Sequence, residues 1–128
     1  MLPEFGNEPF TDFSVEANRK AFTDALKTVQ ARLPIQGKNR INGKKVGAAK
    51  FFESVNPCDP KQVIGRFPAA TAADANKALD AATRAFADWS RFPAAERVSA
   101  ILRISAILRR RKHEFSAMMV LEASKSWA

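Results

Sequence analysis

The sequence predicts an α+β chain that combines amphipathic helices with a short strand hairpin. Between residues 71 and 111, apolar residues recur at spacings of three and four, which is the period of one helix face. Asn42-Gly43, the strongest short signal for a hairpin turn, lies between two segments rich in Lys, Arg and Asn. With 46% hydrophobic and 27% charged residues, the 128-residue composition is typical of a folded globular chain.

The first helix is expected after a polar, Pro-containing segment, residues 1–13, which we expect to wrap over a surface. Ser14 is the expected N-cap, the helix runs to about Arg32, and Pro34 ends it. An apolar stripe along this helix consists of Phe22, Ala25, Leu26, Val29 and Leu33.

An edge hairpin is expected next, from Lys38–Ile41 and Lys44–Val46 around the Asn42-Gly43 turn. Its residues are mostly basic or amide-bearing, so one face of the hairpin is expected to lie in water.

A second pair of strands is expected from Phe51–Val55 and Gln62–Phe67. Asn56-Pro57 stops the first of these strands, and Asp59-Pro60 is expected to form the turn between them.

Thr71 and Asp74 predict the start of another helix, because a threonine N-cap and a carboxylate three residues later can form a capping box. Pro93 interrupts this helix, and the next one ends in the basic run Arg109–Lys112, which suits the negative end of a helix dipole. Two helices joined at a Pro-bearing corner predict an αα-hairpin. The apolar positions are Ala75, Ala78, Leu79, Ala82, Phe86 and Trp89 in the first helix, and Val98, Ile101, Leu102 and Leu108 with Ser105 in the second.

A last helix is expected from His113 to about Ser124. Its apolar side consists of Phe115, Met118, Met119 and Ala123. No run in the sequence approaches the length of a membrane span.

Residues capable of catalysis or metal binding are few and scattered. The single Cys58 excludes an internal disulfide, and one cysteine with one histidine cannot form a zinc site. Cys58 lies in a turn without a neighbouring histidine or helix N-terminus to activate its thiol, so we interpret it as a loop cysteine. His113 follows a basic run on a helical surface. No phosphate-binding loop, serine-hydrolase elbow or metalloprotease motif occurs in the sequence.

The net charge of +8 raises nucleic acid as a partner. The basic residues concentrate in Lys38–Lys50 and Arg97–Lys112, and many fall on polar faces of the expected helices. The aromatic interleaving that single-strand binders use is missing. A solvated face, or a patch that meets an acidic surface in a larger protein, explains the charge as well.

Runs of residues spread over almost the whole chain carry a family resemblance. The first set is Ser54-Val55-Asn56-Pro57, Val63-Ile64-Gly65-Arg66, Ala69-Ala70-Thr71-Ala72-Ala73-Asp74, Ala81–Trp89, Glu96-Arg97, Ile101-Leu102 and Glu122-x-x-Lys125. The second set is Leu2-Pro3-Glu4-Phe5, Asn7–Ser14, Asn18–Phe22 and Arg109–Ser116. The first set resembles the opening of the aldehyde dehydrogenase superfamily. The second is similar to its bacterial 1-pyrroline-5-carboxylate dehydrogenase branch.

This resemblance implies an α/β fold of three layers, of which the chain is expected to be an N-terminal α+β fragment. Residues 1–36 are expected to form an N-terminal extension and helix, and residues 37–128 the truncated start of the aldehyde dehydrogenase domain, a scaffold for the NAD-binding part. The family's catalytic cysteine, glutamate base, oxyanion-stabilising asparagine and NAD-binding loop lie beyond the equivalent of Ala128. The resemblance therefore implies no catalytic, cofactor-binding or metal residue in this chain, and Cys58 is not the nucleophile.

Ser124 departs from the family pattern, because it stands where the Glu-x-Gly-Lys turn usually has glycine. If that position needs a positive φ, a serine there is strained.

The first functional hypothesis is an N-terminal fragment of an NAD-dependent, cytoplasmic dehydrogenase that oxidises L-glutamate γ-semialdehyde in proline catabolism. We expect such a fragment to be inactive alone, to bind no NAD alone, and to partner the remainder of the polypeptide or a full-length relative. Its mark would be an uncovered apolar helix face that includes Phe86, Trp89, Leu102 and Met119. The alternatives are a stand-alone module that binds a full-length dehydrogenase and a basic nucleic-acid-binding domain that uses Arg97–Lys112.

Overall fold

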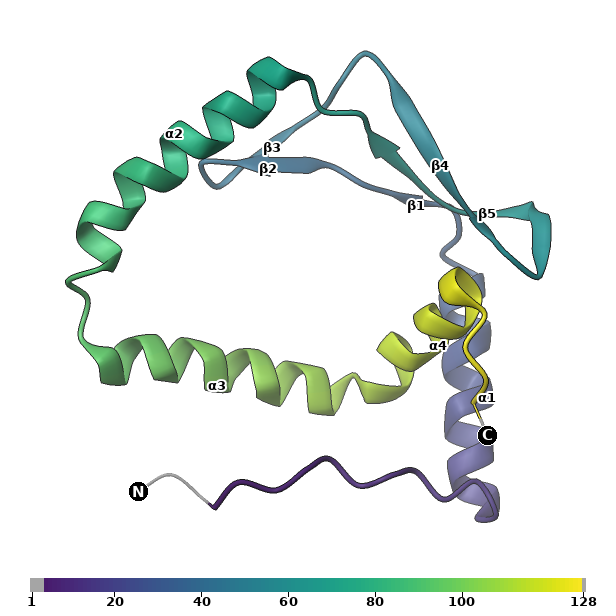
Figure 1. Ribbon diagram of the computed structural model, residues 1–128. Helices are drawn as coiled ribbons and strands as arrows, with labels where there is room; N and C mark the ends of the chain where they lie inside the picture. Colours follow the sequence, from purple (N-terminus) through teal and green to yellow (C-terminus); the bar gives the residue numbers. More distant parts are fainter. Residues whose placement is uncertain (1–3, 128) are drawn as a thin grey trace.

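The computed structural model describes residues 4–127, and its helices and strands form an open ring (Figure 1). Two helices cross at one side of the ring, a small sheet and a separate hairpin form the top, and two long helices close the other side. The helices are α1 (Glu16–Gln30), α2 (Ala72–Trp89), α3 (Ala94–Arg110) and α4 (Lys112–Ala123). The strands are β1 (Ile35–Gln36), β2 (Asn39–Ile41), β3 (Lys44–Val46), β4 (Phe51–Asn56) and β5 (Asp59–Pro68).

The three-stranded sheet has the order β1-β5-β4. β4 and β5 pair antiparallel, and β1 pairs parallel to β5 with Ile35 opposite Gly65. The expected turn at Asp59-Pro60 is wrong, because Asp59 already pairs with Asn56 inside the hairpin. The Asn56 side chain closes the turn two residues earlier: its Oδ1 accepts the Cys58 backbone N–H at 2.9 Å, which is an Asx-turn.

The β2–β3 hairpin confirms the prediction from Asn42-Gly43. Three antiparallel residue pairs precede the turn, and the last of them places Ile41 opposite Lys44. Asn42 has φ 50° and Gly43 has φ 73°. Both central residues thus have the left-handed conformation that a two-residue type I′ turn requires, and asparagine and glycine are the residues that adopt it at low cost.

The hydrophobic core lies where α1 and α4 pack together beneath the sheet. Its fully buried side chains are Phe22, Val29, Ile64, Ala117 and Leu121. Phe22 is 1% exposed, and Trp127 stacks on its ring at 4.9 Å between centroids while Phe13 meets it edge-on at 5.5 Å. We call α1, α4 and the three-stranded sheet the core half of the molecule.

The start of α1 differs from the prediction. The N-cap is Val15 without a side-chain hydrogen bond, and the helix ends at Gln30 rather than near Arg32. Ser14 is no cap, because Asp12 Oδ1 accepts the Ser14 backbone N–H at 2.8 Å and forms a turn ahead of the helix. Upstream, Glu8 forms ion pairs with α3 and α4, so the described part of segment 1–13 wraps over a surface as expected. Residues 1–3 lie outside the described residues.

The start of α2 confirms the predicted capping box. Thr71 Oγ1 accepts the Asp74 backbone N–H at 3.2 Å, and Asp74 Oδ2 accepts the Thr71 backbone N–H at 3.0 Å. The two groups satisfy donors that the first turn of a helix otherwise leaves unpaired.

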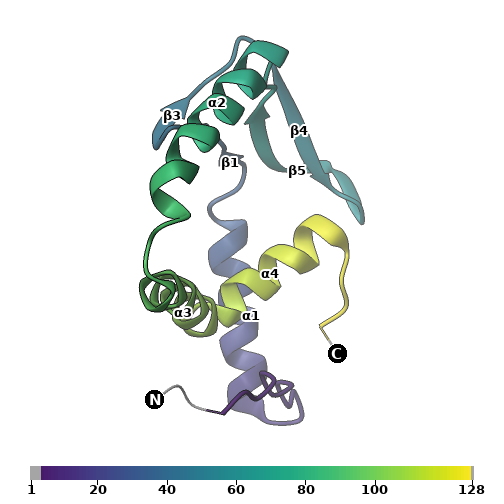
Figure 2. The same cartoon turned by 60° about the vertical axis from the view of Figure 1, so that its left-hand side comes forward.

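The expected αα-hairpin is wrong. From the corner at residues 90–93, α2 and α3 diverge and border the open centre of the ring instead of packing on each other (Figures 1 and 2). Pro93 has an extended ψ of 135°, and Trp89 stacks on Phe92 with 5.8 Å between ring centroids, so the corner is wide. We call α2, the corner and α3 (residues 72–110) the arch.

Candidate functional site

The residues with catalytic potential do not come together. Cys58 is exposed in the β4–β5 turn, with its Sγ 3.1 Å from Ser124 Oγ. His113 lies at the start of α4, where its ring meets Phe22 edge-on. Among residues 4–127 no cluster of His, Cys, Asp and Glu could hold a metal ion. The assignment of no catalytic, cofactor-binding or metal residue to this chain remains a prediction.

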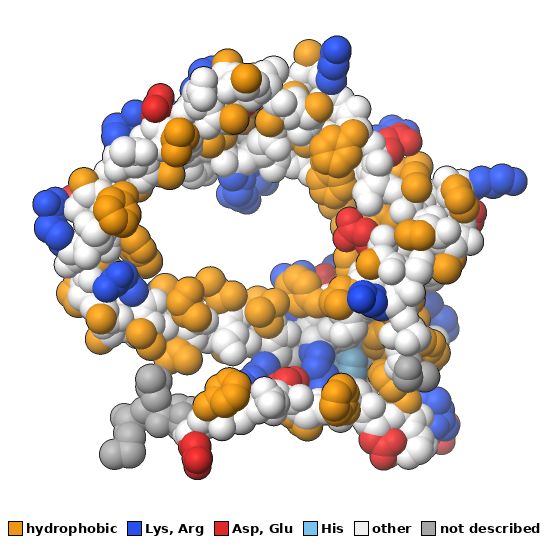
Figure 3. Space-filling model, in the orientation of Figure 1, with side chains coloured by type: hydrophobic (Ala, Val, Ile, Leu, Met, Phe, Trp, Pro, Cys, Tyr) orange, Lys and Arg blue, Asp and Glu red, His pale blue; other side chains and the backbone are white. Residues whose placement is uncertain are grey.

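The prominent surface feature is the uncovered apolar side of the arch. In α2 only Ala81 is buried, whereas Leu79 and Phe86 are each 65% exposed. In α3, among the described side chains, none is buried. Figure 3 shows hydrophobic side chains along the rim of α3 that borders the opening. The exposed apolar residues of the arch are Leu79, Phe86, Trp89, Phe92, Val98, Ile101, Leu102, Ile104, Ile107 and Leu108.

This exposure confirms the expected uncovered face, which also includes Met119 of α4. The predicted stripe of α2 is real, but it does not face the neighbouring hairpin. α2 contacts β2 of that hairpin, and Ala81 is its one buried residue, whereas Leu79 and Phe86 are exposed. The apolar stripe is therefore left for a surface outside these residues.

The total accessible surface shows that the chain is open. The chain exposes 10049 Å², whereas a folded monomer of its 14.1 kDa mass exposes roughly 6,700 Å². The excess, about 3,300 Å², belongs to the whole chain, and the exposed apolar side chains of the arch contribute to it. The arch therefore exposes apolar surface that a folded monomer normally buries.

Among the described residues, one polar side-chain atom is both covered and without a hydrogen-bond partner. This atom is the Nε of Arg97. A covered donor without a partner costs roughly 1–3 kcal/mol. Arg97 is half-buried near the start of α3 and belongs to the apolar side of the arch, as its spacing from Ile101 and Leu108 shows.

The other end of the basic run is paired within the chain. Arg109 and Lys112 bind the carboxylate of Glu8 at 3.1 and 3.3 Å. Arg111 binds Glu114 at 2.8 Å. The part of Arg97–Lys112 that carries the densest charge is thus partly neutralised, which weakens the case for a phosphate-binding surface.

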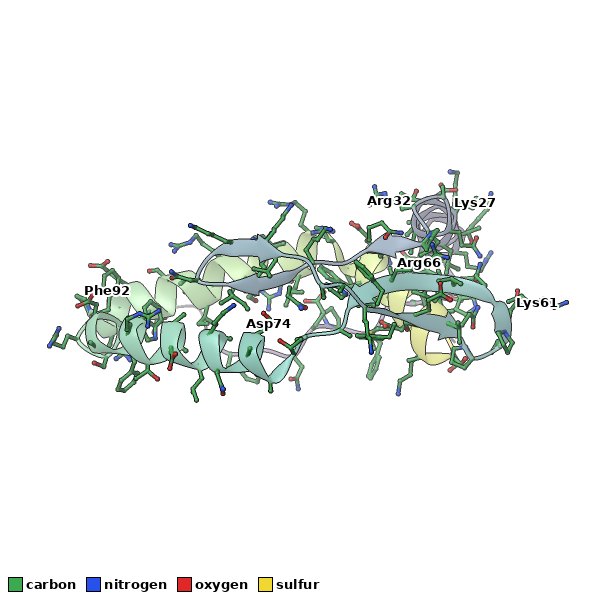
Figure 4. The ribbon with its side chains drawn as sticks, turned by 90° about the horizontal axis from the view of Figure 1, so that it is seen from above. Lys27, Arg32, Lys61, Arg66, Asp74 and Phe92 are labelled. Carbon is green, nitrogen blue, oxygen red and sulfur yellow. The ribbon has the colours of Figure 1, made fainter. Side chains whose placement is uncertain are left out.

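Glu114 of α4 binds two arginines, of which Arg32 follows α1 and Arg111 precedes α4. Arg111 and Arg32 both donate to its carboxylate, the latter at 2.9 Å. The hydrogen bond from Arg111 is the main cause that holds the pKa of Glu114 below its ordinary value. A hollow of about 670 Å³ beside this carboxylate is lined largely by apolar side chains. Figure 4 shows Arg32 at the end of α1, far from Phe92 at the corner of the arch.

Ser124 ends α4 in the left-handed conformation, with φ 51° and ψ 35°. The position therefore does require the backbone geometry that favours glycine. Nearby, Glu122 Oε1 accepts the Ser54 hydroxyl at 3.3 Å, so the end of α4 is tied to β4.

Comparison with known proteins assigns the class. Residues 44–128 match the aldehyde dehydrogenase family model, and the chain belongs to that family. The 1-pyrroline-5-carboxylate dehydrogenase of Geobacillus sp. WCH70 is 46% identical over 127 residues, which are 99% of this chain and 25% of that protein. The chain thus spans about a quarter of the length of such relatives and corresponds to an N-terminal segment.

Solved structures agree with this assignment. A Thermus 1-pyrroline-5-carboxylate dehydrogenase with bound NAD has a TM-score of 0.95 at 35% identity, over 98% of this chain and 24% of that one. The enzyme of Mycobacterium tuberculosis has a TM-score of 0.85 at 27% identity, over 94% of this chain and 23% of that one. These matches confirm both the resemblance drawn from the motifs and the α/β class, of which this chain forms a fragment.

No helix among the described residues has the length and apolar character needed to cross a membrane.

Proposed function

We propose that this chain is the N-terminal scaffold segment of an NAD-dependent 1-pyrroline-5-carboxylate dehydrogenase, a cytoplasmic enzyme that oxidises L-glutamate γ-semialdehyde to glutamate. The observation that carries the proposal is 46% identity across 99% of the chain to a quarter of such an enzyme. Residues 1–36 form the extension and first helix, and residues 37–128 begin the catalytic polypeptide's domain. Chemistry and NAD binding depend on sequence that corresponds to the other three quarters of the relatives.

A chimera tests this proposal. The aligned 127 residues of this chain replace their counterparts in the Geobacillus enzyme, and NAD reduction is followed with L-glutamate γ-semialdehyde as substrate. We expect the chimera to be soluble and active, and the isolated chain to show neither turnover nor NAD binding. An inactive or insoluble chimera would overturn the proposal, because the segment then fails to serve as a scaffold; turnover by the isolated chain would also contradict it.

The size of the uncovered surface favours one alternative, a stand-alone module that binds a full-length dehydrogenase. This reading predicts that the isolated chain forms a complex with the intact Geobacillus enzyme. The scaffold reading predicts no such complex, because the intact enzyme already supplies its own equivalent of the segment. Co-migration of the two proteins in size-exclusion chromatography distinguishes the readings.

A further inference from the structure

Arg97 occupies an unusual place for a charged side chain. Ile101, Ile104 and Leu108 follow it at four, seven and eleven residues, so it shares their face of α3. These three side chains are uncovered. Whatever covers them must also enclose the Arg97 guanidinium, and a charge enclosed without a partner is strongly unfavourable.

Several other arginines of the chain already have carboxylates. Arg32, Arg66 and Arg109 form ion pairs with Glu114, Glu53 and Glu8. The Arg97 Nε is covered and has no hydrogen-bond partner. The net charge of +8 also means that the chain holds fewer carboxylates than basic groups. A carboxylate for Arg97 is therefore best supplied from outside the chain.

We infer that Arg97 is the polar anchor of the arch and forms an enclosed ion pair with an Asp or Glu side chain of the polypeptide that covers α3. The occupant is the part of the dehydrogenase that corresponds to the remaining three quarters of the relatives, so the inference rests on the proposed function. The chain exposes about 3,300 Å² more surface than a folded monomer of its mass, as a segment that packs against a larger polypeptide does. A guanidinium can meet a carboxylate in bidentate fashion, which fixes the register of the two surfaces as well as their attraction.

The chimera provides the test, with three variants in it. Arg97→Met keeps the length and apolar stem of the side chain but removes its charge. Arg97→Lys keeps the charge but removes the planar guanidinium that can bind a carboxylate in bidentate fashion. Arg103→Met is the matched control. Arg103 is exposed on the same helix, and its side chain leaves the helix axis about 120° around from that of Arg97. The readouts are the half-life of thermal inactivation and a crystal structure of the chimera.

We expect Arg97→Met to shorten the half-life about tenfold or more, since one member of an enclosed pair is lost. Arg97→Lys should lie between Arg97→Met and the unsubstituted chimera, and Arg103→Met should stay within about twofold of it. The crystal structure should place a carboxylate oxygen within hydrogen-bond distance of the Arg97 guanidinium.

Two results would overturn the inference while leaving the proposed function intact. One is an active chimera in which Arg97→Met matches Arg103→Met. The other is an active chimera whose crystal structure shows the Arg97 guanidinium in water or beside a backbone carbonyl. If Arg97→Met is stable and Arg97→Lys is not, the role of Arg97 is packing rather than charge, and the inference is equally wrong. An inactive chimera would overturn both the proposed function and this inference.

Discussion

The core half and the arch contain similar apolar side chains but bury them very differently. In the core half, Phe22 and Ile64 are each 1% exposed and α1 packs along α4. In the arch, Phe86 is 65% exposed and α3 has no buried residue among those described. The same chain thus holds one part that completes its own core and another whose apolar side chains have no core of their own.

Physical stability should divide along the same line. Helical stability in proteins comes mainly from the packing of an apolar face against other elements. Isolated helices shorter than about 12–15 residues are only marginally stable in water. The 17-residue α3 and the 18-residue α2 receive little packing. We therefore expect the core half of the isolated chain to unfold cooperatively and the arch to lose structure at lower denaturant concentration.

The largest effect is expected from Phe22→Ala, compared with Phe86→Ala as a matched control. Removal of the buried ring should lower the free energy of unfolding of the core half by about 3–5 kcal/mol. Removal of the exposed ring should change it by about 0.5 kcal/mol or less. Urea unfolding monitored by tryptophan fluorescence measures both, since Trp127 stacks on Phe22. Equal losses in the two variants would show that the halves form one cooperative unit.

The next effect concerns the end of α4. The left-handed Ser124 has φ 51°, a conformation that costs an L-residue roughly 1–2 kcal/mol. Ser124→Gly should remove most of this strain and stabilise the core half by about 1 kcal/mol, measured as a higher urea midpoint. Ser124→Ala is the control, because it keeps the strain while losing the Oγ–Sγ contact to Cys58 at 3.1 Å. A lower midpoint for Ser124→Gly than for Ser124→Ala would argue against the strain.

A smaller, local effect is expected from Thr71→Ala at the start of α2. Loss of the cap should destabilise that helix by about 1 kcal/mol and reduce the helical signal in far-UV circular dichroism. α2 is only loosely attached to the core half. The urea midpoint of core-half unfolding, which the stacking of Trp127 on Phe22 reports, should therefore not move. A shift of that midpoint would mean that the arch and the core half are coupled in the isolated chain.

The smallest effects concern acid. Hydrogen bonding to Arg111 holds the pKa of Glu114 below its ordinary value of 4.5, and bonds to Thr71 hold that of Asp74 below 3.8. Each carboxylate therefore contributes stability that is fully present above its unfolded pKa and is lost as pH falls through its lower folded pKa. The free energy of unfolding should decline as pH falls below about 4.5, and Glu114→Gln should make this decline shallower. An unchanged pH profile in Glu114→Gln would exclude this contribution.

Local signals in the sequence predicted local structure well. Asn42-Gly43 specifies a turn that only residues tolerant of positive φ adopt, and the Thr71–Asp74 capping box needs no distant partner. The error at Ser14 arose because Asp12, another short polar residue, took the turn that was expected to cap α1. These elements depend on neighbours within a few residues, which the sequence displays directly.

Tertiary arrangement was less accessible, and the arch shows why. Periodicity in α2 indicates an apolar face, but it does not say which surface covers that face. An αα-hairpin was the simplest way to bury both stripes inside the chain, and it is wrong because the burying surface lies elsewhere. The anchor role proposed for Arg97 was not predicted from the sequence, although the spacing of Arg97 from Ile101 and Leu108 places a charge on an apolar face.

Amide hydrogen exchange of the isolated chain distinguishes a self-sufficient core half from a dependent arch. We expect slow exchange in α1 and α4, where Phe22 and Leu121 are buried, and fast exchange throughout α3. In the chimera, where the arch is covered, α3 should become as protected as α1. Equal protection of α1 and α3 in the isolated chain would contradict the claim that the arch depends on a surface outside it.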